Sequence, residues 1–284
     1  RDTMPLAGRH GELRQLLQLW DEVLSGAPRI AITRAAAGMG KTRLMEELAR
    51  HVHAQGHQVY RIECRLELQH RPLGAVIACL ESEADIAAHD PAPLRREKLE
   101  RHLSLTAPQM ADSQKTSLLE AIGAPALGAH PLQAKSLLFA AMQQLLATAS
   151  SRGPVLLLVD DLHWADMATL EILEILVKGL GNQPILLMLT GRNDLLAHLT
   201  EPNILRLDLP PLDMSSALAL INAADWMNKL SEGAKQHIAF VCGGIPLFLQ
   251  RLTRDMTEGR TYHQPIAELL QSELDRLGAA KDVL

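Results

Sequence analysis

The sequence predicts an α/β fold with a parallel, doubly wound sheet, followed by a small all-helical domain. Short apolar stretches alternate with amphipathic helical patterns through most of the chain, which is typical of strands and helices that alternate in an α/β core. Residues 154–160 (PVLLLVD) form a continuous apolar run, as expected for a strand buried on both faces of a parallel sheet. After Pro210-Pro211 only helical patterns remain.

The predicted elements begin with a helix. Apolar residues recur there at three- and four-residue spacing, namely Leu13, Leu16, Leu17, Trp20 and Leu24. Gly26-Ala27-Pro28 ends this helix. We then expect a strand over 29–34, a helix over 42–55 and a second strand over 58–64.

Residues 65–152 show helical patterns interrupted by prolines and no convincing strand, so we expect a helical insertion in the sheet domain. Within it, the run Arg95-Arg96-Glu97-Lys98 is interpreted as a solvated helix face. After the apolar strand, a helix over 166–180 and strands over 184–190 and 204–209 complete the sheet domain.

Pro210-Pro211 is the predicted domain boundary. It divides the chain into a nucleotide-binding α/β domain, residues 1–209, and a helical domain, residues 210–284. Four short helices are expected after the boundary, over 213–224, 231–242, 246–257 and 264–277.

Composition narrows the function classes. The net charge is −5 and aromatic residues make up 3% of the chain, whereas a dedicated nucleic-acid binder has a basic face and stacking platforms. We therefore expect no nucleic-acid partner for this segment.

The three cysteines of the chain are scattered without CxxC spacing, which suits a reducing cytosol. Apolar runs too short to span a bilayer also favour a cytoplasmic protein without membrane contact. The chain opens on Arg1 rather than Met, so we expect a piece of a longer protein.

Residues 35–42 (AAAGMGKT) fit the P-loop pattern if alanine is allowed at its first position. Small residues let successive backbone N–H groups surround a phosphate, and the following helix directs its positive end there. We expect Lys41 to neutralise the β- and γ-phosphates of ATP and Thr42 to bind Mg²⁺. The alternative is a chance turn rich in Ala and Gly, but the apolar strand before it and the helix after it favour a nucleotide site.

Asp160 and Asp161 directly follow the buried strand. A P-loop enzyme needs an acidic residue at the end of a neighbouring strand to hold Mg²⁺, and Asp160 occupies that place. Asp161 is then expected to orient or deprotonate the attacking water. A helix-capping turn is the alternative for this pair, because aspartate favours such positions.

Arg192 follows the next strand in the segment Thr190-Gly191-Arg192. Ligands of open α/β folds bind at the carboxyl ends of the strands, where this cation would reach the γ-phosphate. A surface arginine in a loop is an equally open interpretation.

Several segments together resemble one known family. They are residues 6–13 (LAGRHGEL), 37–44 (AGMGKTRL), 159–166 (VDDLHWAD) and 242–249 (CGGIPLFL). The chain resembles the ATPase module of the signal-transduction ATPases with numerous domains (STAND), a branch of the AAA+ P-loop NTPases. The likeness is to the bacterial type attached to class III adenylate/guanylate cyclases and LuxR-like transcription regulators.

The resemblance implies a role for each matching position. Leu6 and Arg9 belong to the segment whose backbone lies beside the adenine, and Pro246 to a motif that contacts the base. Arg192 acquires a phosphate-sensing role. The P-loop positions implied to bind nucleotide are Gly38, Met39, Gly40, Lys41, Thr42 and Arg43. Residues 274–277 (LDRL) look like the lead-in to a winged-helix domain that this chain lacks.

Two departures from the family pattern bear on activity. Family members usually carry Gly-Glu where this chain has Ala35-Ala36, so hydrolysis is more affected than binding. The missing winged helix helps to lock the ADP state in the family.

The leading hypothesis is an ATP-binding, slowly hydrolysing regulatory switch in a larger multidomain signalling protein, with ATP/ADP and Mg²⁺ as ligands. Exchange of ADP for ATP would license self-association or an attached output domain. One alternative is a non-hydrolysing module that holds ATP or ADP structurally. Another is an initiator-like AAA+ ATPase that acts on DNA.

Overall fold

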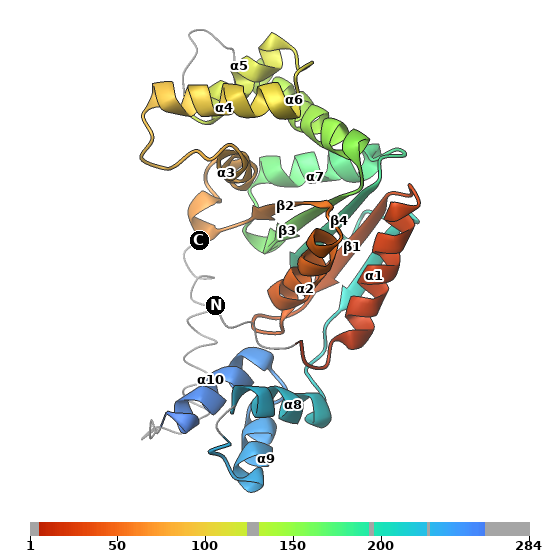
Figure 1. Ribbon diagram of the computed structural model, residues 1–284, viewed down its shortest axis with the longest axis vertical. Helices are drawn as coiled ribbons and strands as arrows, with labels where there is room; N and C mark the ends of the chain where they lie inside the picture. Colours follow the sequence, from red (N-terminus) through yellow and green to blue (C-terminus); the bar gives the residue numbers. More distant parts are fainter. Residues whose placement is uncertain (1–5, 124–130, 193–195, 226–227, 259–284) are drawn as a thin grey trace.

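Five parallel strands form one sheet in the order β2-β3-β4-β1-β5, and helices cover both of its faces (Figure 1). The computed structural model describes residues 6–123, 131–192, 196–225 and 228–258. The strands are β1 (Arg29–Arg34), β2 (Gln58–Glu63), β3 (Val155–Asp160), β4 (Ile185–Gly191) and β5 (Ile204–Asp208). The predicted fold class is confirmed, and each predicted strand begins and ends within one residue of the observed one.

Side chains on the central strands alternate between two separate cores because successive residues of a strand point to opposite faces. On β3, Leu156 and Leu158 pack in the core under α1 (His10–Leu24) and α2 (Lys41–Ala54). Leu157 and its neighbours Val155 and Val159 pack on the opposite face. All six residues of β3 are buried, which explains why the strand reads as an unbroken apolar run.

The two faces have different covers. Helix α1 contributes Leu16, Trp20 and Val23 to the first core. Leu16 and Trp20 belong to the predicted apolar face, whereas Leu24 is exposed and Val23 is buried instead. The second face is covered by α7 (Met167–Gly179) and by the helices of the insertion.

The predicted insertion is confirmed as helical where the structure describes it. Its elements are the short helix η1 (Leu66–Leu68), α3 (Gly74–Glu83), α4 (Ala92–Thr106), α5 (Asp112–Ala121) and α6 (Pro131–Arg152). Within the described part of residues 65–152 no strand occurs. In Figure 1, α4, α5 and α6 form a layer at the top, and α3 lies beside α7.

The interpretation of the run Arg95-Arg96-Glu97-Lys98 as a solvated face is wrong for two of its members. The Arg95 side chain is 13% exposed, pairs with Glu81 at 2.5 Å and donates to the main-chain carbonyl of Ile122 at 2.9 Å. Lys98 pairs with Asp90 at 2.8 Å. These two side chains hold parts of the insertion together, because Glu81 belongs to α3, Ile122 follows α5 and Asp90 precedes α4. The local sequence around α4 does not reveal these partners.

Three further helices, α8 (Met214–Ala224), α9 (Glu232–Val241) and α10 (Pro246–Thr257), form a unit with a core of its own. Leu220, Ile238 and Leu249 lie at the centre of that core. The unit lies below the loop that precedes α2 in Figure 1. The division of the chain at residues 209 and 210 stays a prediction that this separate core supports. The helix expected over 264–277, with the motif at 274–277, lies outside the described residues.

No helix in the described ranges has both the length and the apolar character needed to cross a membrane.

Candidate functional site

The loop between β1 and α2 has the backbone shape of a phosphate cradle. Gly38 (φ +77°) and Gly40 (φ +90°) take left-handed conformations that glycine adopts without strain. Neither Ala35 nor Ala36 has a positive φ, so alanine is compatible with the first position of the motif. Gly40 immediately precedes α2, whose first-turn N–H groups therefore face the loop.

Lys41 is the first residue of α2 and is buried, with 6% of its surface exposed. Its Nζ donates to the carbonyls of Ala35 at 2.8 Å and Ala36 at 3.0 Å. Burial lowers the pKa of this ammonium, and nearby Asp161 partly offsets that effect while Arg192 adds to it. A cation held this close to the cradle in a low-dielectric setting interacts strongly with an anion.

Asp160 ends β3 and is tied to two neighbouring elements. Thr42 at the start of α2 donates its hydroxyl to Oδ2 of Asp160 at 2.9 Å. Thr190 near the end of β4 donates its hydroxyl to Oδ1. The parallel register aligns the ends of β3 and β4 at one edge of the sheet, and Thr42 reaches this edge from α2.

Asp161 leaves the strand through a left-handed conformation, with φ +54°. Its N–H donates to Oδ1 of Asp160 at 3.0 Å and to Oγ1 of Thr190 at 3.1 Å. Burial raises the pKa of the Asp161 carboxyl, Asp160 raises it further, and Lys41 opposes both. Asp161 holds the N-cap position of the short helix η2 (Leu162–Trp164), but its side chain makes no capping hydrogen bond there. The longer helix α7 is capped by Asp166. The helix-capping alternative therefore describes the position of Asp161 but not the role of its side chain.

Arg192 directly follows β4, and its guanidinium carbon lies 5.9 Å from the centre of the Trp164 ring. This cation–π contact orients the side chain. Its charge contributes to the lowered pKa of Lys41, which places the two cations near each other around one space.

The helical unit reaches the phosphate loop directly. The N–H of Leu247 in α10 donates to the carbonyl of Gly38 at 3.2 Å. Pro246, at the start of α10, lies beside Gly40: a Cβ built on Gly40 would stand 4.0 Å from the proline ring.

Arg9 also connects the phosphate loop with the segment that leads into the helical unit. It is 3% exposed, and its guanidinium donates to the carbonyl of Met39 at 3.3 Å and to that of Pro210. An ion pair with Glu12 at 3.1 Å orients it. The side chain of Arg9 therefore joins the phosphate loop to the segment that leads into the helical unit.

A cleft of about 420 Å³ lies between the sheet edge and the helical unit. Every predicted site residue except Asp160 lines it, namely Leu6, Arg9, Gly38, Met39, Gly40, Lys41, Thr42, Arg43, Asp161, Arg192 and Pro246. Asp160 is hydrogen-bonded to one of them, Thr42. The structure thus brings the predicted set together.

Sequence reasoning missed part of the lining. Leu212, Leu220, Leu247 and Gln250 come from the helical unit or its lead-in, and Thr190 fixes Asp160 from β4. The position of Leu247 directly after Pro246 was the available signal. The apolar residues of the unit resemble ordinary core positions in the sequence, and only the folded arrangement turns them towards the cleft.

The donor set fits Mg²⁺ bound together with phosphates. In the described ranges no group of three or more His, Cys, Asp or Glu side chains converges into a metal cage. Mg²⁺ keeps several waters and is usually bound through one or two protein oxygens plus substrate phosphates. The bonded pair of Thr42 and Asp160, beside the phosphate cradle, supplies oxygens of that kind.

Solved structures with the same fold include two from origin-recognition proteins. The Aeropyrum pernix ORC1 protein in complex with DNA matches at a TM-score of 0.57 and 15% identity, over 96% of this chain and 66% of that one. The structure of Drosophila ORC bound to DNA matches at a TM-score of 0.54 and 14% identity, over 98% of this chain and 63% of that one. A third structure is that of a STAND protein with a tetratricopeptide repeat sensor from Pyrococcus horikoshii. It matches at a TM-score of 0.52 and 13% identity, over 97% of this chain and 33% of that one. At these identities the likeness concerns the fold alone.

Among curated proteins, an uncharacterized protein of Rhizobium meliloti (strain 1021) is 26% identical over 98% of this chain. The chain spans 29% of the length of that relative. A family model described as the AAA ATPase domain (AAA_16) matches residues 5–188, well over half of the chain, and includes the phosphate loop and the acidic pair. The chain therefore belongs to the AAA ATPase domain family, whose members bind nucleotides.

Proposed function

We propose that this chain is an ATP-binding, slowly hydrolysing regulatory switch of the STAND type. The observation that carries the proposal is the meeting, in one cleft, of the phosphate cradle, Thr42 and α10 of the helical unit, with Asp160 hydrogen-bonded to Thr42 behind the cleft lining. A nucleotide bound there would touch both the sheet and the helical unit, so its phosphates would affect how the two are joined.

Each site residue has a role that its position supports. Lys41 would bind the β- and γ-phosphates, and the N–H groups of the Gly38–Gly40 loop would surround them. Mg²⁺, held through Thr42 and Asp160, would neutralise charge on the transferred phosphoryl group. Asp161, whose pKa is raised by burial, is the candidate for orienting the attacking water. Arg192 would sense the γ-phosphate.

The adenine side is formed by the chain start and the helical unit. Leu6 and Arg9 approach from the N-terminal segment, and Pro246 from α10, with Arg43 on the rim of the same cleft. The apolar lining residues Leu212 and Leu220 suit a planar base.

A nucleotide can drive a switch only by binding two states with different affinity. The hydrogen bond from the Leu247 N–H to the Gly38 carbonyl ties α10 to the loop that would carry the phosphates. Loss of the γ-phosphate would change the surroundings of Arg192 and Lys41, and this bond would transmit the change to α10.

The wider setting also belongs to the proposal. The relative from Rhizobium meliloti is more than three times as long as the matched segment, which supports a module within a larger protein. We propose a cytoplasmic signalling protein of the type attached to class III cyclases or LuxR-like regulators. Its output domain would be released, or its self-association allowed, when ATP replaces ADP.

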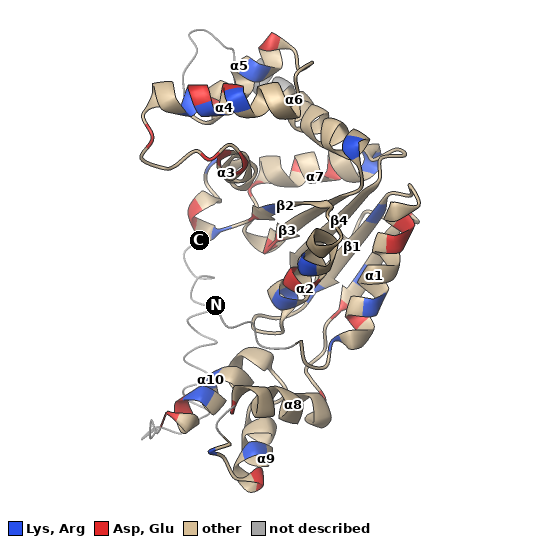
Figure 2. Cartoon of the chain, viewed as in Figure 1, with Lys and Arg blue, Asp and Glu red and all other residues tan. Residues whose placement is uncertain are grey.

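Two other functions each have an observation in their favour. Ala36 stands where the family carries glutamate, which favours a module that holds nucleotide without turnover. The origin-recognition structures, both bound to DNA, favour an initiator-like ATPase. Against the second, acidic and basic side chains are interspersed on α1, α2 and α4 (Figure 2), and the net charge is −5.

Thermal unfolding with and without nucleotide tests the proposal. Mg·ATP or Mg·ADP at a hundredfold over its dissociation constant should stabilise the protein by about 2.7 kcal/mol. That corresponds to a rise of roughly 5–10 °C in the melting midpoint for a chain of this size. Lys41→Ala should abolish the rise, whereas Lys178→Ala, which removes an exposed lysine from α7, should keep it.

Turnover separates the enzymatic proposal from the structural one. Asp161→Asn should keep the thermal shift and lose phosphate release by about a hundredfold or more. Wild-type phosphate release equal to that of Lys41→Ala would favour the non-hydrolysing module. An unshifted wild type that also carries no co-purified nucleotide would contradict nucleotide binding altogether.

A further inference from the structure

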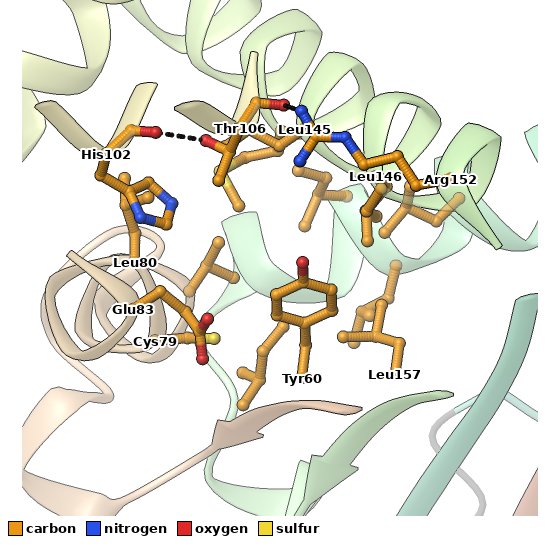
Figure 3. Close-up of a pocket in the computed structure, with 17 residues that line it drawn as sticks. Tyr60, Cys79, Leu80, Glu83, His102, Thr106, Leu145, Leu146, Arg152 and Leu157 are labelled. Carbon is orange, nitrogen blue, oxygen red and sulfur yellow. Dashed lines mark hydrogen bonds between the residues drawn. The ribbon is translucent and has the colours of Figure 1, made fainter. Parts of the chain in front are cut away.

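A second cavity lies on the opposite face of the sheet, between β2–β3, α7 and the insertion (Figure 3). Its volume is about 80 Å³, and it shares no lining residue with the nucleotide cleft. Its interior is apolar. The buried side chains that line it are Ile62, Val76, Leu80, Leu157, Ile172, Leu173 and Leu176.

The size of this space limits what fits in it. An engineered apolar cavity of roughly 150 Å³ binds benzene, and the present cavity is about half as large. A small alkyl group fits these dimensions, and a fused ring system does not. A tail of this kind would contact branched aliphatic side chains on all sides, which is the usual lining of a small-molecule pocket.

Three side chains that are able to accept hydrogen bonds line the cavity, namely Glu83, His102 and Tyr60. Figure 3 shows Glu83 of α3, His102 of α4 and Tyr60 of β2 around the same space. The Glu83 residue is exposed, so its carboxylate lies at the mouth of the cavity, and partial desolvation raises the pKa of that carboxyl. Within the described residues its side chain has no hydrogen bond or ion pair with another side chain or the main chain.

The other two groups favour the same kind of ligand. Burial lowers the pKa of the His102 imidazole, so the ring is neutral at neutral pH and has one nitrogen able to accept a hydrogen bond. Tyr60 donates its hydroxyl to Gln58 at 3.2 Å and keeps its lone pairs. Burial and the charge of Glu83 raise the pKa of Tyr60, as expected for a phenol next to a carboxylate.

The positive charge at this cavity is already engaged elsewhere. Arg152 lies on the opposite side in Figure 3, and its guanidinium donates to the carbonyl of Leu105 at 2.7 Å and to that of Thr106 at 3.3 Å. Its charge is therefore directed to the end of α4 rather than to Glu83. Within the described residues no protein cation pairs with the Glu83 carboxylate, so a ligand at the mouth of the cavity can pair with it.

We propose that this cavity binds a small primary amine with an apolar tail, the ammonium group at Glu83 and the tail among the leucines of α7 and β3. A cation with several N–H donors matches the carboxylate, the imidazole nitrogen and the phenol oxygen together. The tail matches the apolar interior in size and chemistry. This site is independent of the nucleotide cleft, so it does not rest on the proposed function.

Propylamine is the probe, with 1-propanol and propionate as comparators of similar shape. Methyl-labelled methionine gives a local readout, because Met142 lines the cavity whereas Met45 lies in the core on the other face of the sheet. The Met142 resonance should shift saturably with propylamine, and that of Met45 should not. The alcohol and the acid should bind about five- to tenfold more weakly, since a partly exposed ion pair contributes a modest factor.

Two variants separate the roles of charge and cavity. Glu83→Gln should weaken the amine to the level of the alcohol, whereas Glu100→Gln, on the exposed side of α4, should change nothing. Ala149→Leu places extra carbons in the cavity from α6 and should abolish binding. Lys41→Ala should leave amine binding intact. If Ala149→Leu does not fold, Glu83→Gln still decides, because the Glu83 side chain has no hydrogen bond or ion pair within the described residues whose loss would destabilise the protein.

Two results would overturn the proposal. One is equal binding of amine and alcohol with no effect of Glu83→Gln, because the carboxylate then selects nothing. The other is an unmoved Met142 resonance at saturating amine in a folded wild type.

Discussion

His163, two residues after the acidic pair, is buried with both ring nitrogens lacking a hydrogen-bond partner in the described structure. Its Nδ1 lies 3.7 Å from Oδ1 of Asp161. Burial lowers the pKa of the imidazole to about 4, and Arg192 and Lys41 contribute to the same direction. The ring is therefore neutral in the folded protein at neutral pH. An ordinary histidine in the unfolded chain takes up a proton near pH 6.5.

This difference predicts an acid-dependent loss of stability. Between pH 6.5 and about 4, His163 is protonated in the unfolded chain but stays neutral in the folded protein. The free energy of unfolding therefore falls as pH falls through this range. The full contribution is about 3 kcal/mol as an upper limit. Urea denaturation across this range should show a smaller loss for His163→Phe than for the wild type.

The control for this measurement is His53→Gln, since His53 is exposed on α2. It should reproduce the wild-type pH profile. Identical profiles for His163→Phe and the wild type would show that the ring is accessible to protons in the folded state.

The start of α7 depends on one carboxylate that serves more than one element. Oδ1 of Asp166 accepts from the N–H groups of Ala168 at 2.9 Å and Thr169 at 3.0 Å, which caps the helix. The same oxygen accepts from the N–H of Leu73 at 3.0 Å, at the beginning of the insertion. Asp166 thus connects the insertion to the segment that follows the acidic pair.

Asp166→Ala should lower the free energy of unfolding by about 2–4 kcal/mol, because it removes a helix cap and leaves the buried N–H of Leu73 without an acceptor. Asp213→Ala is the matched control. Asp213 caps α8 at the surface through the N–H of Ser216, and its loss should cost about 1 kcal/mol. Chemical denaturation of both variants tests the difference, and equal losses would show that the bond to Leu73 adds nothing.

At the scale of the whole molecule, Arg9 joins the sheet domain to the helical unit. The guanidinium bonds to the carbonyls of Met39 and Pro210 link the phosphate loop to the connection between the two parts. Because Arg9 is buried, its removal leaves two carbonyls with fewer donors and an unfilled space.

We therefore expect Arg9→Ala to loosen the helical unit before the sheet domain unfolds. Amide hydrogen exchange should become faster in α8–α10 than in β3 and β4, by a factor that corresponds to about 2–4 kcal/mol. Arg29→Ala, which removes an arginine with a partly exposed ion pair to Glu22, should leave the pattern unchanged. Uniformly faster exchange over the whole chain in Arg9→Ala would contradict a local joining role.

The sequence by itself determined the strands, the phosphate loop and the placement of the acidic pair. Apolar runs such as β3 are unbroken because both faces of the strand are buried, and Gly38 and Gly40 are needed where φ is positive. These features can be recognised from the sequence because each depends on a short stretch of consecutive residues. The resemblance to a known ATPase module then indicated Pro246, and it added a phosphate-sensing role for Arg192, whose place after a strand was already evident.

Only the tertiary structure decided the contacts between distant segments. Arg95 and Lys98 look solvated in the sequence because their partners, Glu81 and Asp90, lie in other parts of the insertion. The bond from Leu247 to Gly38 joins residues more than two hundred positions apart. The amine cavity likewise requires β2, α3, α4, α6 and α7 to converge on one space. The physical reason is that long-range packing fixes which polar and apolar groups face one another, and no local pattern in the chain records it.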